Sequence, residues 1–260
     1  MQLDGRFALI TGAGSGIGRA LAVEGSHRGM TVAFCGRRAD ALAGTLALLD
    51  PSKAHIVIPA DLTRAEDRAA IVARLKEAWG RLDVLVNNAG VVTGGALETE
   101  ADAALEQLIA TNVTAPIALT RDLLPLLLAA KPSRVVNIGS MFGDIPFPLF
   151  AAYSATKFAL RGFSEALRRE FRDRGISVTY AAPRATKTEA ADALEKLIAA
   201  MQPRLDDPAA VAAQIWIAVE KGEASVYPGR AERFFVVLQR LFPALVDSAV
   251  CKQMAKLIAS

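Results

Sequence analysis

The apolar and polar positions along this chain repeat one unit, in which a short apolar run is followed by a turn and then by a longer segment with helical spacing. Most of the short runs are apolar throughout, and strands of that kind are buried on both faces of a parallel sheet. The runs expected to form strands are Phe7–Thr11, Thr31–Cys35, His55–Pro59, Val84–Asn87, Arg134–Ile138, Ile176–Ala181 and Ala224–Tyr227. The pattern therefore predicts the α/β class, a doubly wound parallel sheet of about seven strands.

Segments with helical spacing separate these strands, and several are followed by a glycine where a helix should end. These segments are Ile17–Arg28, Ala39–Leu49, Arg64–Trp79, Ala101–Ala130, Ala152–Arg174 and Pro208–Lys221. No linker or low-complexity tract interrupts the pattern, so residues 1–229 are expected to form one domain. Residues 230–260 keep helical spacing and offer no further strand, which predicts a helical C-terminal extension.

The composition fits one substantial core with a soluble surface, since the 260 residues are 52% hydrophobic and 22% charged. A net charge of +3 is small for this length and gives no reason to expect nucleic acid binding. Cys35 and Cys251 stand far apart in the sequence, as is typical of proteins in a reducing compartment. No group of His, Cys and carboxylate residues has the spacing of a metal site, so we expect no metal.

The first residues lack the basic and apolar regions of a secretory signal, and no window reaches the roughly 18 apolar residues of a spanning helix. We therefore expect a cytoplasmic protein without a transmembrane segment.

The first strand runs directly into a glycine-rich turn, Gly12–Gly18, which opens the first helix. Glycines let the backbone approach a pyrophosphate, and the following helix N-terminus offers unpaired N–H groups. The spacing is T-G-x-x-x-G-x-G rather than G-x-G-x-x-G. In this Rossmann-like context the turn predicts a dinucleotide site, and the alternative is a tight turn without a ligand.

The residues after the second strand discriminate between the two nicotinamide dinucleotides. An acidic residue there would bind the ribose hydroxyls and repel a 2′-phosphate. This chain has Arg37 and Arg38 instead, whose guanidinium groups can bind a phosphate. The sequence therefore favours NADP over NAD, unless both arginines are solvated residues at a helix start.

Tyr153 and Lys157 stand four residues apart, on one face of a predicted helix. Ser140 follows the fifth strand and precedes that helix, so the three polar groups are expected to meet at the carboxyl edge of the sheet, where doubly wound domains bind ligands. Taken alone, Ser140 would be interpreted as a helix or turn cap.

With these motifs the chain up to about Gly229 resembles the short-chain dehydrogenase/reductase family. This chain has residues that look like the catalytic set of that family, namely Ser140, Tyr153 and Lys157, and Asn112 matches its fourth catalytic position. The segments similar to its cofactor-binding motifs are Thr11–Gly18, Asp61–Thr63 and Asn87–Gly90. The residues that the turn, the arginines and the resemblance together assign to cofactor binding are Gly12, Ser15, Gly16, Ile17, Gly18, Arg37, Arg38, Asp61, Leu62, Asn88, Ala89, Gly90, Tyr153, Lys157, Pro183, Thr186 and Thr188.

The resemblance implies an NADP-dependent oxidoreductase that acts on CH–OH groups and moves a hydride between the nicotinamide and an alcohol or carbonyl substrate. Tyr153 would be the general acid in reduction and the base in oxidation, with Lys157 lowering its pKa and binding the nicotinamide ribose. Ser140 would orient the carbonyl oxygen, and Asn112 would hold a water that links Lys157 to solvent.

The chain departs from the family after the sixth strand, where the family usually has Pro-Gly and then a threonine. Here Arg184 follows Pro183, and Thr186 replaces a usually apolar residue. A backbone shape that glycine adopts freely is expected to be strained for arginine. Arg184 either faces the substrate cleft and selects an anionic or polar group, or is a solvated residue on a loop.

Residues 184–205 are expected to form a substrate lid, by resemblance. From Glu189 to Leu205 an apolar helical face is predicted, which indicates an at least partly apolar substrate. The residues of that face are Ala190, Leu194, Leu197 and Ile198.

The extension from Arg230 to Ser260 mixes aromatic and aliphatic residues with basic ones. Three roles stay open, in this order of preference: docking on a sister subunit, covering the substrate cleft, and peripheral contact with a membrane. The family is generally oligomeric and usually pairs through long helices, here Ala101–Ala130 and Ala152–Arg174, so we expect a homo-oligomer.

Two other functions compete with the dehydrogenase. One is a non-catalytic redox sensor that binds the dinucleotide, which only the Arg184 departure supports. The other is a dehydratase or epimerase among the extended relatives, whose glycine spacing differs and whose chains are longer.

Overall fold

A parallel sheet of seven strands forms the centre of the molecule, in the spatial order β3-β2-β1-β4-β5-β6-β7. The computed structural model describes residues 1–187, 205–227 and 229–258. The strands are β1 (Phe7–Thr11), β2 (Thr31–Gly36), β3 (Ile56–Pro59), β4 (Val84–Asn87), β5 (Ser133–Ile138), β6 (Ile176–Ala181) and β7 (Ser225–Val226). Each neighbouring pair is parallel. The prediction of a doubly wound α/β sheet of about seven strands is confirmed.

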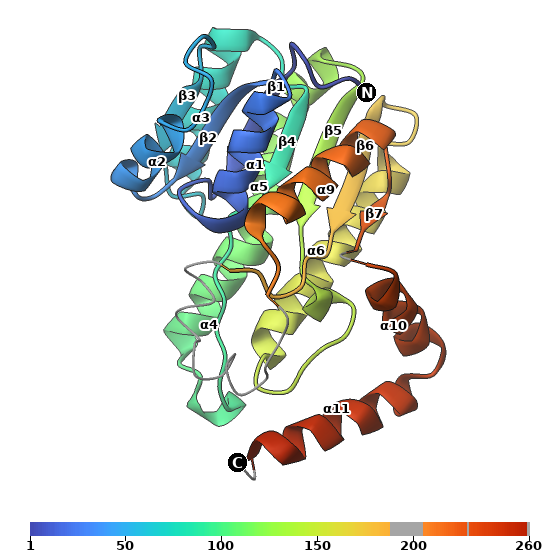
Figure 1. The fold of residues 1–260 in the computed structure, drawn as a ribbon. Helices are drawn as coiled ribbons and strands as arrows, with labels where there is room; N and C mark the ends of the chain where they lie inside the picture. Colours follow the sequence, from blue (N-terminus) through green and yellow to red (C-terminus); the bar gives the residue numbers. More distant parts are fainter. Residues whose placement is uncertain (188–204, 228, 259–260) are drawn as a thin grey trace.

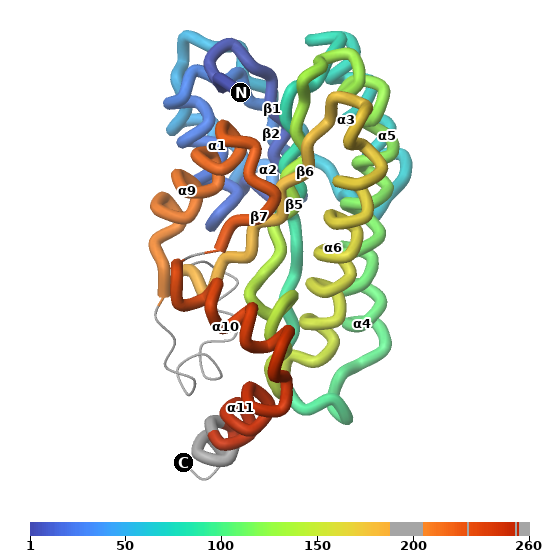
Figure 2. Tube along the Cα trace, turned by 90° about the vertical axis from the view of Figure 1, so that its right-hand side faces the viewer, coloured from blue at the N-terminus to red at the C-terminus, as the bar shows by residue number. Residues whose placement is uncertain are grey.

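Helices cover both faces of this sheet (Figure 1, Figure 2). Two buried apolar cores lie between the layers, one with side chains of α1, α2 and α9, the other with side chains of α3, α5 and α6. The helices are α1 (Gly16–His27), α2 (Ala39–Leu46), α3 (Ala65–Trp79), α4 (Asp102–Ile109), α5 (Ala115–Ala129), α6 (Ala151–Glu170), α9 (Pro208–Lys221), α10 (Arg230–Leu241) and α11 (Pro243–Ile258). Since all strands point the same way, their carboxyl ends meet at one edge, the lower one in Figure 1.

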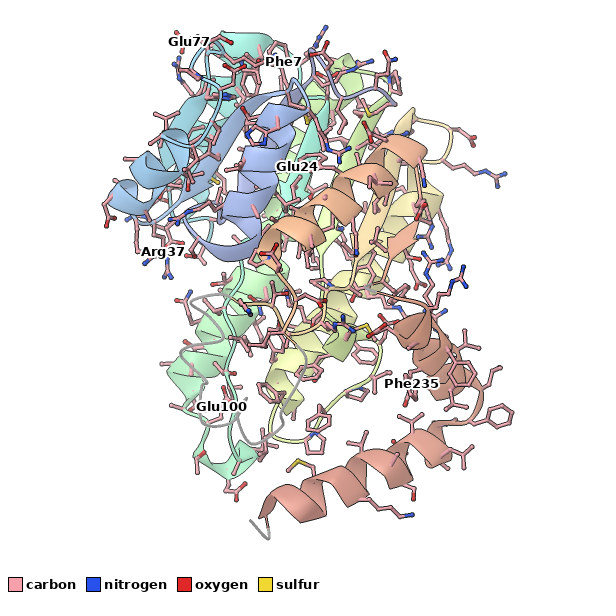
Figure 3. The ribbon with its side chains drawn as sticks, viewed as in Figure 1. Phe7, Glu24, Arg37, Glu77, Glu100 and Phe235 are labelled. Carbon is pink, nitrogen blue, oxygen red and sulfur yellow. The ribbon has the colours of Figure 1, made fainter. Side chains whose placement is uncertain are left out.

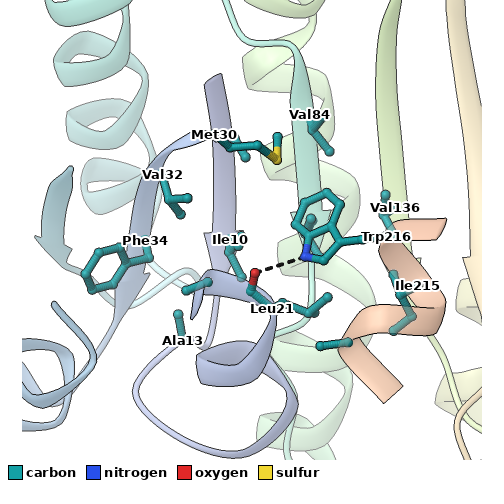
Figure 4. Close-up of a cluster of buried hydrophobic side chains, with 14 of the residues drawn as sticks. Ile10, Ala13, Leu21, Met30, Val32, Phe34, Val84, Val136, Ile215 and Trp216 are labelled. Atoms are coloured by element: carbon teal, nitrogen blue, oxygen red, sulfur yellow. Dashed lines mark hydrogen bonds between the residues drawn. The ribbon is translucent and has the colours of Figure 1, made fainter. Parts of the chain in front are cut away.

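Trp216 of α9 packs in the core formed with α1 and α2 and joins α9 to α1 (Figure 4). The indole is fully buried, and its N–H donates to the carbonyl oxygen of Leu21 in α1 at 3.0 Å. Gly25 of α1 leaves room for the ring, because a Cβ there would lie 3.2 Å from it. The indole thus buries a large apolar surface and satisfies its one donor.

The observed elements differ from the predicted ones mostly at their ends. Several strands shift by one or two residues, and α2 and α6 stop at Leu46 and Glu170 rather than at Leu49 and Arg174. Helix ends fray and depend on tertiary contacts, so periodicity alone locates them poorly.

The segment predicted as one helix over Ala101–Ala130 is helical from Asp102 to Ala129, but a π-helical turn, η2 (Ala110–Thr114), lies between α4 and α5. Pro116 stands at the start of α5 and has no N–H to donate to the carbonyl of Asn112, four residues before it. The wider turn inserts an extra residue into the helix, as π-bulges do, and Asn112 lies buried within it.

The chain continues from β7 into α10 and α11, which lie beyond the carboxyl edge of the sheet in both views (Figure 1, Figure 2). Over the described parts of the chain no single helix has the length and apolar character to cross a membrane. Helix α10 and the first part of α11 reach that level only as a pair, bent by 116°.

Candidate active site

A cavity of about 540 Å³ opens at the carboxyl edge of the sheet and begins at the glycine turn between β1 and α1. Its size lies in the range of small-molecule sites, and its place beside β1 and β4, where the strand order reverses, is where doubly wound sheets bind ligands. The predicted site residues that line it are Gly12, Ser15, Gly16, Ile17, Gly18, Arg37, Arg38, Asp61, Leu62, Asn88, Ala89, Gly90, Ser140, Tyr153, Lys157, Pro183 and Thr186. Thr188 and the apolar face of the predicted lid lie outside the described residues.

The glycine turn packs tightly against the end of β4. Gly12 has φ +66°, and a Cβ there would lie 2.7 Å from the Cα of Ala89. A Cβ on Gly18 would collide with the carbonyl oxygen of Gly12. The Thr11 hydroxyl oxygen accepts the backbone N–H groups of Asn88 and Ala89, both at 2.9 Å. These two glycines therefore bring two strand ends together, as well as leaving space for a ligand.

The first turn of α1 offers N–H groups to the cavity. Ser15 is the N-cap residue, and its side chain makes no capping hydrogen bond. Gly16, with φ +53°, and Ile17 follow it along the cavity wall. The free N–H groups of an uncapped helix N-terminus with a glycine backbone can donate hydrogen bonds to phosphate oxygens.

Arg37 and Arg38 follow β2 at the outer end of the cavity, and both are exposed. Figure 3 shows Arg37 at the edge of the molecule. Asp61 lines the same end after β3, and its carboxylate accepts the hydroxyl and backbone N–H of Thr63 at 2.7 and 3.0 Å. These hydrogen bonds, with a smaller effect of nearby Arg37, lower the pKa of Asp61. This end of the cavity therefore combines two arginines with one ionised carboxylate.

Ser140, Tyr153 and Lys157 meet at the inner end, as the sequence predicts. The Ser140 side chain lies close enough to the Tyr153 hydroxyl to lower its pKa through hydrogen bonding. The Lys157 ammonium donates to the carbonyl oxygen of Ile138 at 3.2 Å and lies 5.5 Å from the centre of the Tyr153 ring. Ser140 also caps the short helix η3 (Met141–Gly143) by accepting the N–H of Phe142 at 3.2 Å, so the cap and the site role coexist.

Burial moves the pKa values of this pair toward the neutral forms. Burial raises the pKa of the Tyr153 hydroxyl to about 12, against a lowering by the hydrogen bond with Ser140. Burial also lowers the pKa of the Lys157 ammonium to about 8. Burial sets the direction of the Tyr153 pKa, and Lys157 is not among its causes, so the expected lowering of this pKa by Lys157 stays a prediction.

Asn112 stands behind the site and does not line the cavity. Its amide N–H groups donate to the Val91 carbonyl at 2.8 Å and the Thr156 hydroxyl at 3.1 Å, and its oxygen accepts the Val91 N–H at 2.8 Å. The side chain therefore ties the loop after β4 to the helix turn that carries Lys157.

Arg184 lines the cavity, yet its guanidinium is held by two carboxylates. It makes two parallel hydrogen bonds to Asp206, at 2.8 and 2.7 Å, and a third to Glu232 of α10. No positive φ is found at Arg184, so the expected backbone strain is absent there. Arg184 thus faces the cavity, as one of the two interpretations expects, and it also joins the loop after β6 to the C-terminal extension, as a bidentate arginine can. Selection of an anionic or polar substrate group by Arg184 stays a prediction.

An aromatic cluster beside Tyr153 was missed by the sequence analysis. Phe142 packs against Phe150 and Tyr153, with ring centres 5.0 and 6.3 Å apart, and both phenylalanines line the cavity. Val250 and Met254 of α11 pack on this cluster from outside. The spacing of four residues between Val250 and Met254 was the only signal in the sequence, and it does not show which part of the protein these side chains contact.

An ionic cluster around the buried Asp144 was missed as well. Asp144 is buried and lies 2.9 Å from the guanidinium of Arg161 and 3.4 Å from that of Arg240. The hydroxyl of Tyr227 donates to it at 3.1 Å. Burial raises the pKa of Asp144 although both arginines oppose it. Within the described ranges no three His, Cys, Asp or Glu side chains gather in a way that could hold a metal ion.

Comparison with protein families matches residues 6–198 to the model described as short chain dehydrogenase. The putative oxidoreductase SadH of Mycobacterium tuberculosis is 32% identical over 270 residues, which cover 98% of this chain and 97% of the relative. The 3-oxoacyl-[acyl-carrier-protein] reductase of rhamnolipid biosynthesis from Pseudomonas aeruginosa is 38% identical over 187 residues, or 70% of this chain and 73% of that protein. The dehydrogenase/reductase SDR family protein 7-like of Anopheles gambiae is 36% identical over 70% of this chain, which spans only 59% of that relative.

Solved structures agree with the fold. A short chain dehydrogenase/reductase from Burkholderia phymatum, in complex with NAD, has a TM-score of 0.86 at 26% identity and covers 94% of this chain and 96% of its own. A short-chain dehydrogenase from Sphingobium yanoikuyae, in complex with NADPH, has a TM-score of 0.79 at 29% identity, with coverages of 96% and 95%.

Proposed function

Because the chain belongs to the short-chain dehydrogenase/reductase family, an oxidoreductase family, we propose that it uses NADP to interconvert a partly apolar alcohol and its ketone, with Tyr153 as the proton-transferring residue. The observation that carries this proposal is the meeting of the Tyr153 and Ser140 hydroxyls inside the cavity, beside the buried Lys157. Carbonyl reduction needs a proton donor at the oxygen and a hydride donor at the carbon, and this pair of hydroxyls supplies the first.

The residues of the cavity fit a nicotinamide dinucleotide. The uncapped start of α1, at Ser15 and Gly16, suits a pyrophosphate. A Cβ at Gly90 would lie 3.2 Å from Asn112 and 3.7 Å from the Lys157 ammonium, so glycine keeps the inner end of the cavity open. When bound, the nicotinamide would supply or accept the hydride.

Tyr153 would give its proton to the substrate oxygen during reduction and take it back during oxidation. Its pKa of about 12 keeps it protonated at neutral pH, which suits the acid role. Ser140 donates to the same substrate oxygen and fixes its position.

Lys157 would bind the nicotinamide ribose and stabilise Tyr153 when it is deprotonated. With a pKa of about 8 the ammonium is mostly charged at neutral pH. Because this pKa lies near neutral pH, a charge beside Lys157 would change the protonated fraction of the amine. Asn112 acts indirectly, by fixing Thr156 in the helix turn before Lys157.

The preference for NADP rests on Arg37 and Arg38 at the outer end of the cavity. Two guanidinium groups favour a 2′-phosphate, and the one nearby carboxylate, Asp61, follows β3 rather than β2, so the end of β2 carries no acidic residue. Equal or lower Michaelis constants for NAD than for NADP would contradict this preference.

The apolar part of the substrate would lie against Phe142 and Phe150, which line the cavity next to Tyr153. Aromatic walls of this kind bind alkyl or ring substituents through buried apolar area.

The test is a screen of ketones and secondary alcohols, in which absorbance of the reduced nicotinamide is followed with each cofactor. Turnover of a ketone that carries an apolar substituent, faster with NADPH than with NADH, is the expected result. Tight NADPH binding without turnover of any carbonyl would favour the redox sensor. Arg184 no longer supports that sensor, because Asp206 and Glu232 account for its position.

A further inference from the structure

The C-terminal helices expose an unusually apolar surface. Six large apolar side chains between residues 234 and 245 are 50–65% exposed. We call them the apolar face: Phe234, Phe235, Val237, Leu241, Phe242 and Leu245. Phe235 belongs to α10 at the lower right of the molecule in Figure 3. Contiguous apolar patches of this kind are rare on soluble monomers and mark a binding surface.

The opposite side of the same helices is firmly packed. Val236, Val246 and Met254 are each less than 8% exposed. Glu232 and Arg240 anchor α10 to Arg184 and Asp144 of the main domain. The apolar face is therefore the outward side of a docked element, and its exposure does not come from a lack of inner contacts.

Charges around the apolar face are mostly positive. Along the described side chains from 230 to 252 the exposed charged residues are Arg230, Arg233, Arg240, Asp247 and Lys252. The one other charged residue of this stretch, Glu232, is only partly exposed and is paired with Arg184. Arg233 lies 3.9 Å from Glu223 and Arg240 lies 3.4 Å from Asp144, yet the side chains of both arginines are more than half exposed. Aromatic and aliphatic side chains bordered by basic ones are typical of helices that lie in a membrane interface.

The surface fits a bilayer better than a second copy of this chain. A two-fold dimer through this face would set the same basic residues against one another, whereas anionic lipid headgroups complement them. The bend of 116° between α10 and α11 suits two helices lying on a surface rather than crossing it.

We propose that α10 and α11 bind the surface of an anionic lipid bilayer, with the apolar face immersed among the headgroups and the basic side chains paired with lipid phosphates. This inference does not rest on the enzymatic activity. It has a consequence for the substrate, since Val250 and Met254 of α11 pack on the aromatic cluster at the inner end of the cavity. Docking therefore holds that end of the cavity next to the lipid.

The experiment is co-sedimentation of the full chain with vesicles of phosphatidylcholine, and with vesicles of phosphatidylcholine mixed with phosphatidylglycerol. We expect binding to the mixed vesicles, little binding to phosphatidylcholine alone, and release by high salt. The double variant Leu241→Ser/Leu245→Ser should bind the mixed vesicles about tenfold more weakly, because two half-exposed leucines no longer enter the lipid.

A matched control is Leu48→Ser, which removes a leucine that is 53% exposed on the main domain, away from α10 and α11. This variant should bind vesicles like the unchanged chain. Thermal unfolding of each variant shows whether the fold is kept. The double variant Arg230→Gln/Arg233→Gln tests how much these two positive charges contribute to vesicle binding, without altering the apolar face.

Absence of binding to phosphatidylglycerol vesicles would overturn the proposal. So would equal binding by the double leucine variant and the unchanged chain. Light scattering gives the oligomeric state of each protein. If the unchanged chain is an oligomer, the double variant is a monomer and neither binds vesicles, a second copy of the chain covers the apolar face.

Discussion

The hydroxyl of Tyr153 and the ammonium of Lys157 share one water-poor pocket, and burial acts on their pKa values in opposite directions. The sequence predicted both residues and Ser140, because their spacing and their place after β5 are local features. The pKa values could not be predicted, since they depend on how much of the surrounding chain excludes water.

Replacing Tyr153 by Phe should lower turnover by about 10²–10⁴-fold and leave NADPH affinity nearly unchanged, because the hydroxyl acts in proton transfer. Steady-state kinetics and a fluorescence titration with NADPH measure the two effects. Tyr227→Phe is the matched control, since that hydroxyl serves Asp144 outside the cavity and its loss should leave most turnover. Full turnover by Tyr153→Phe would remove Tyr153 from the mechanism.

The stability of the protein should depend on pH through Lys157. The folded-state pKa of about 8 lies below the ordinary value of 10.5, so the unfolded chain binds more protons between these values. As pH falls from 10.5 through about 8, the unchanged protein should lose stability relative to Lys157→Met. Urea unfolding of both proteins across this range measures the difference, and a constant difference would show that Lys157 is solvated.

Among the elements, the glycine turn has the strictest requirement for its residues. Gly18→Ala should unfold the turn or open it, because the new Cβ would collide with the Gly12 carbonyl oxygen at the junction with β4. Loss of NADPH binding together with a lower melting temperature is the expected outcome.

The control for Gly18→Ala is Gly162→Ala in α6, where nothing lies within 4 Å of the added Cβ. That change should stabilise the protein by about 0.5–1 kcal/mol, since alanine is the better helix former. If Gly18→Ala and Gly162→Ala change the stability equally, the backbone around Gly18 can shift to accept a Cβ at little cost in free energy.

The clasp of Arg184 to Asp206 and Glu232 should hold α10 in place. Glu232→Gln removes one charge from the clasp, and we expect faster amide hydrogen exchange in α10 with little change in the sheet. Glu66→Gln, which breaks an exposed ion pair with Arg64, should leave exchange in α10 unaltered. Unchanged exchange in Glu232→Gln would mean that apolar contacts alone hold the helix.

Element types were predictable from periodicity, and their interruptions were not. The apolar runs located all seven strands, because five of them are buried almost throughout, while β3 and β7 at the sheet edges are only partly buried. The π-turn around Asn112 escaped notice, since the apolar spacing of the flanking segments continues across it. Pro116 was the available signal, because a proline removes the helical donor to the residue four positions earlier.

At the scale of the whole molecule, contacts between distant segments were invisible to local patterns. Arg240 reaches Asp144, 96 residues earlier, and Met254 packs on the aromatic cluster beside the cavity. The sequence left three roles open for the extension, since helical spacing says which face is apolar and not what covers it.

The homo-oligomer expected from the family stays a proposal at this scale. Support comes from exposed apolar side chains on the adjoining helices α4, α5 and α6, namely Ile109, Ile117 and Phe158. This surface is separate from α10 and α11, so subunit pairing and lipid binding do not compete for the same residues.

The two cysteines differ in their reactivity. Cys35 is fully buried in β2, where burial raises its thiol pKa to about 12, while Cys251 is exposed on α11. Only the thiolate reacts with maleimides, so a dye added to the native chain should attach at Cys251 alone. A polarity-sensitive fluorophore attached at Cys251 would therefore report directly whether α11 is surrounded by water or by lipid.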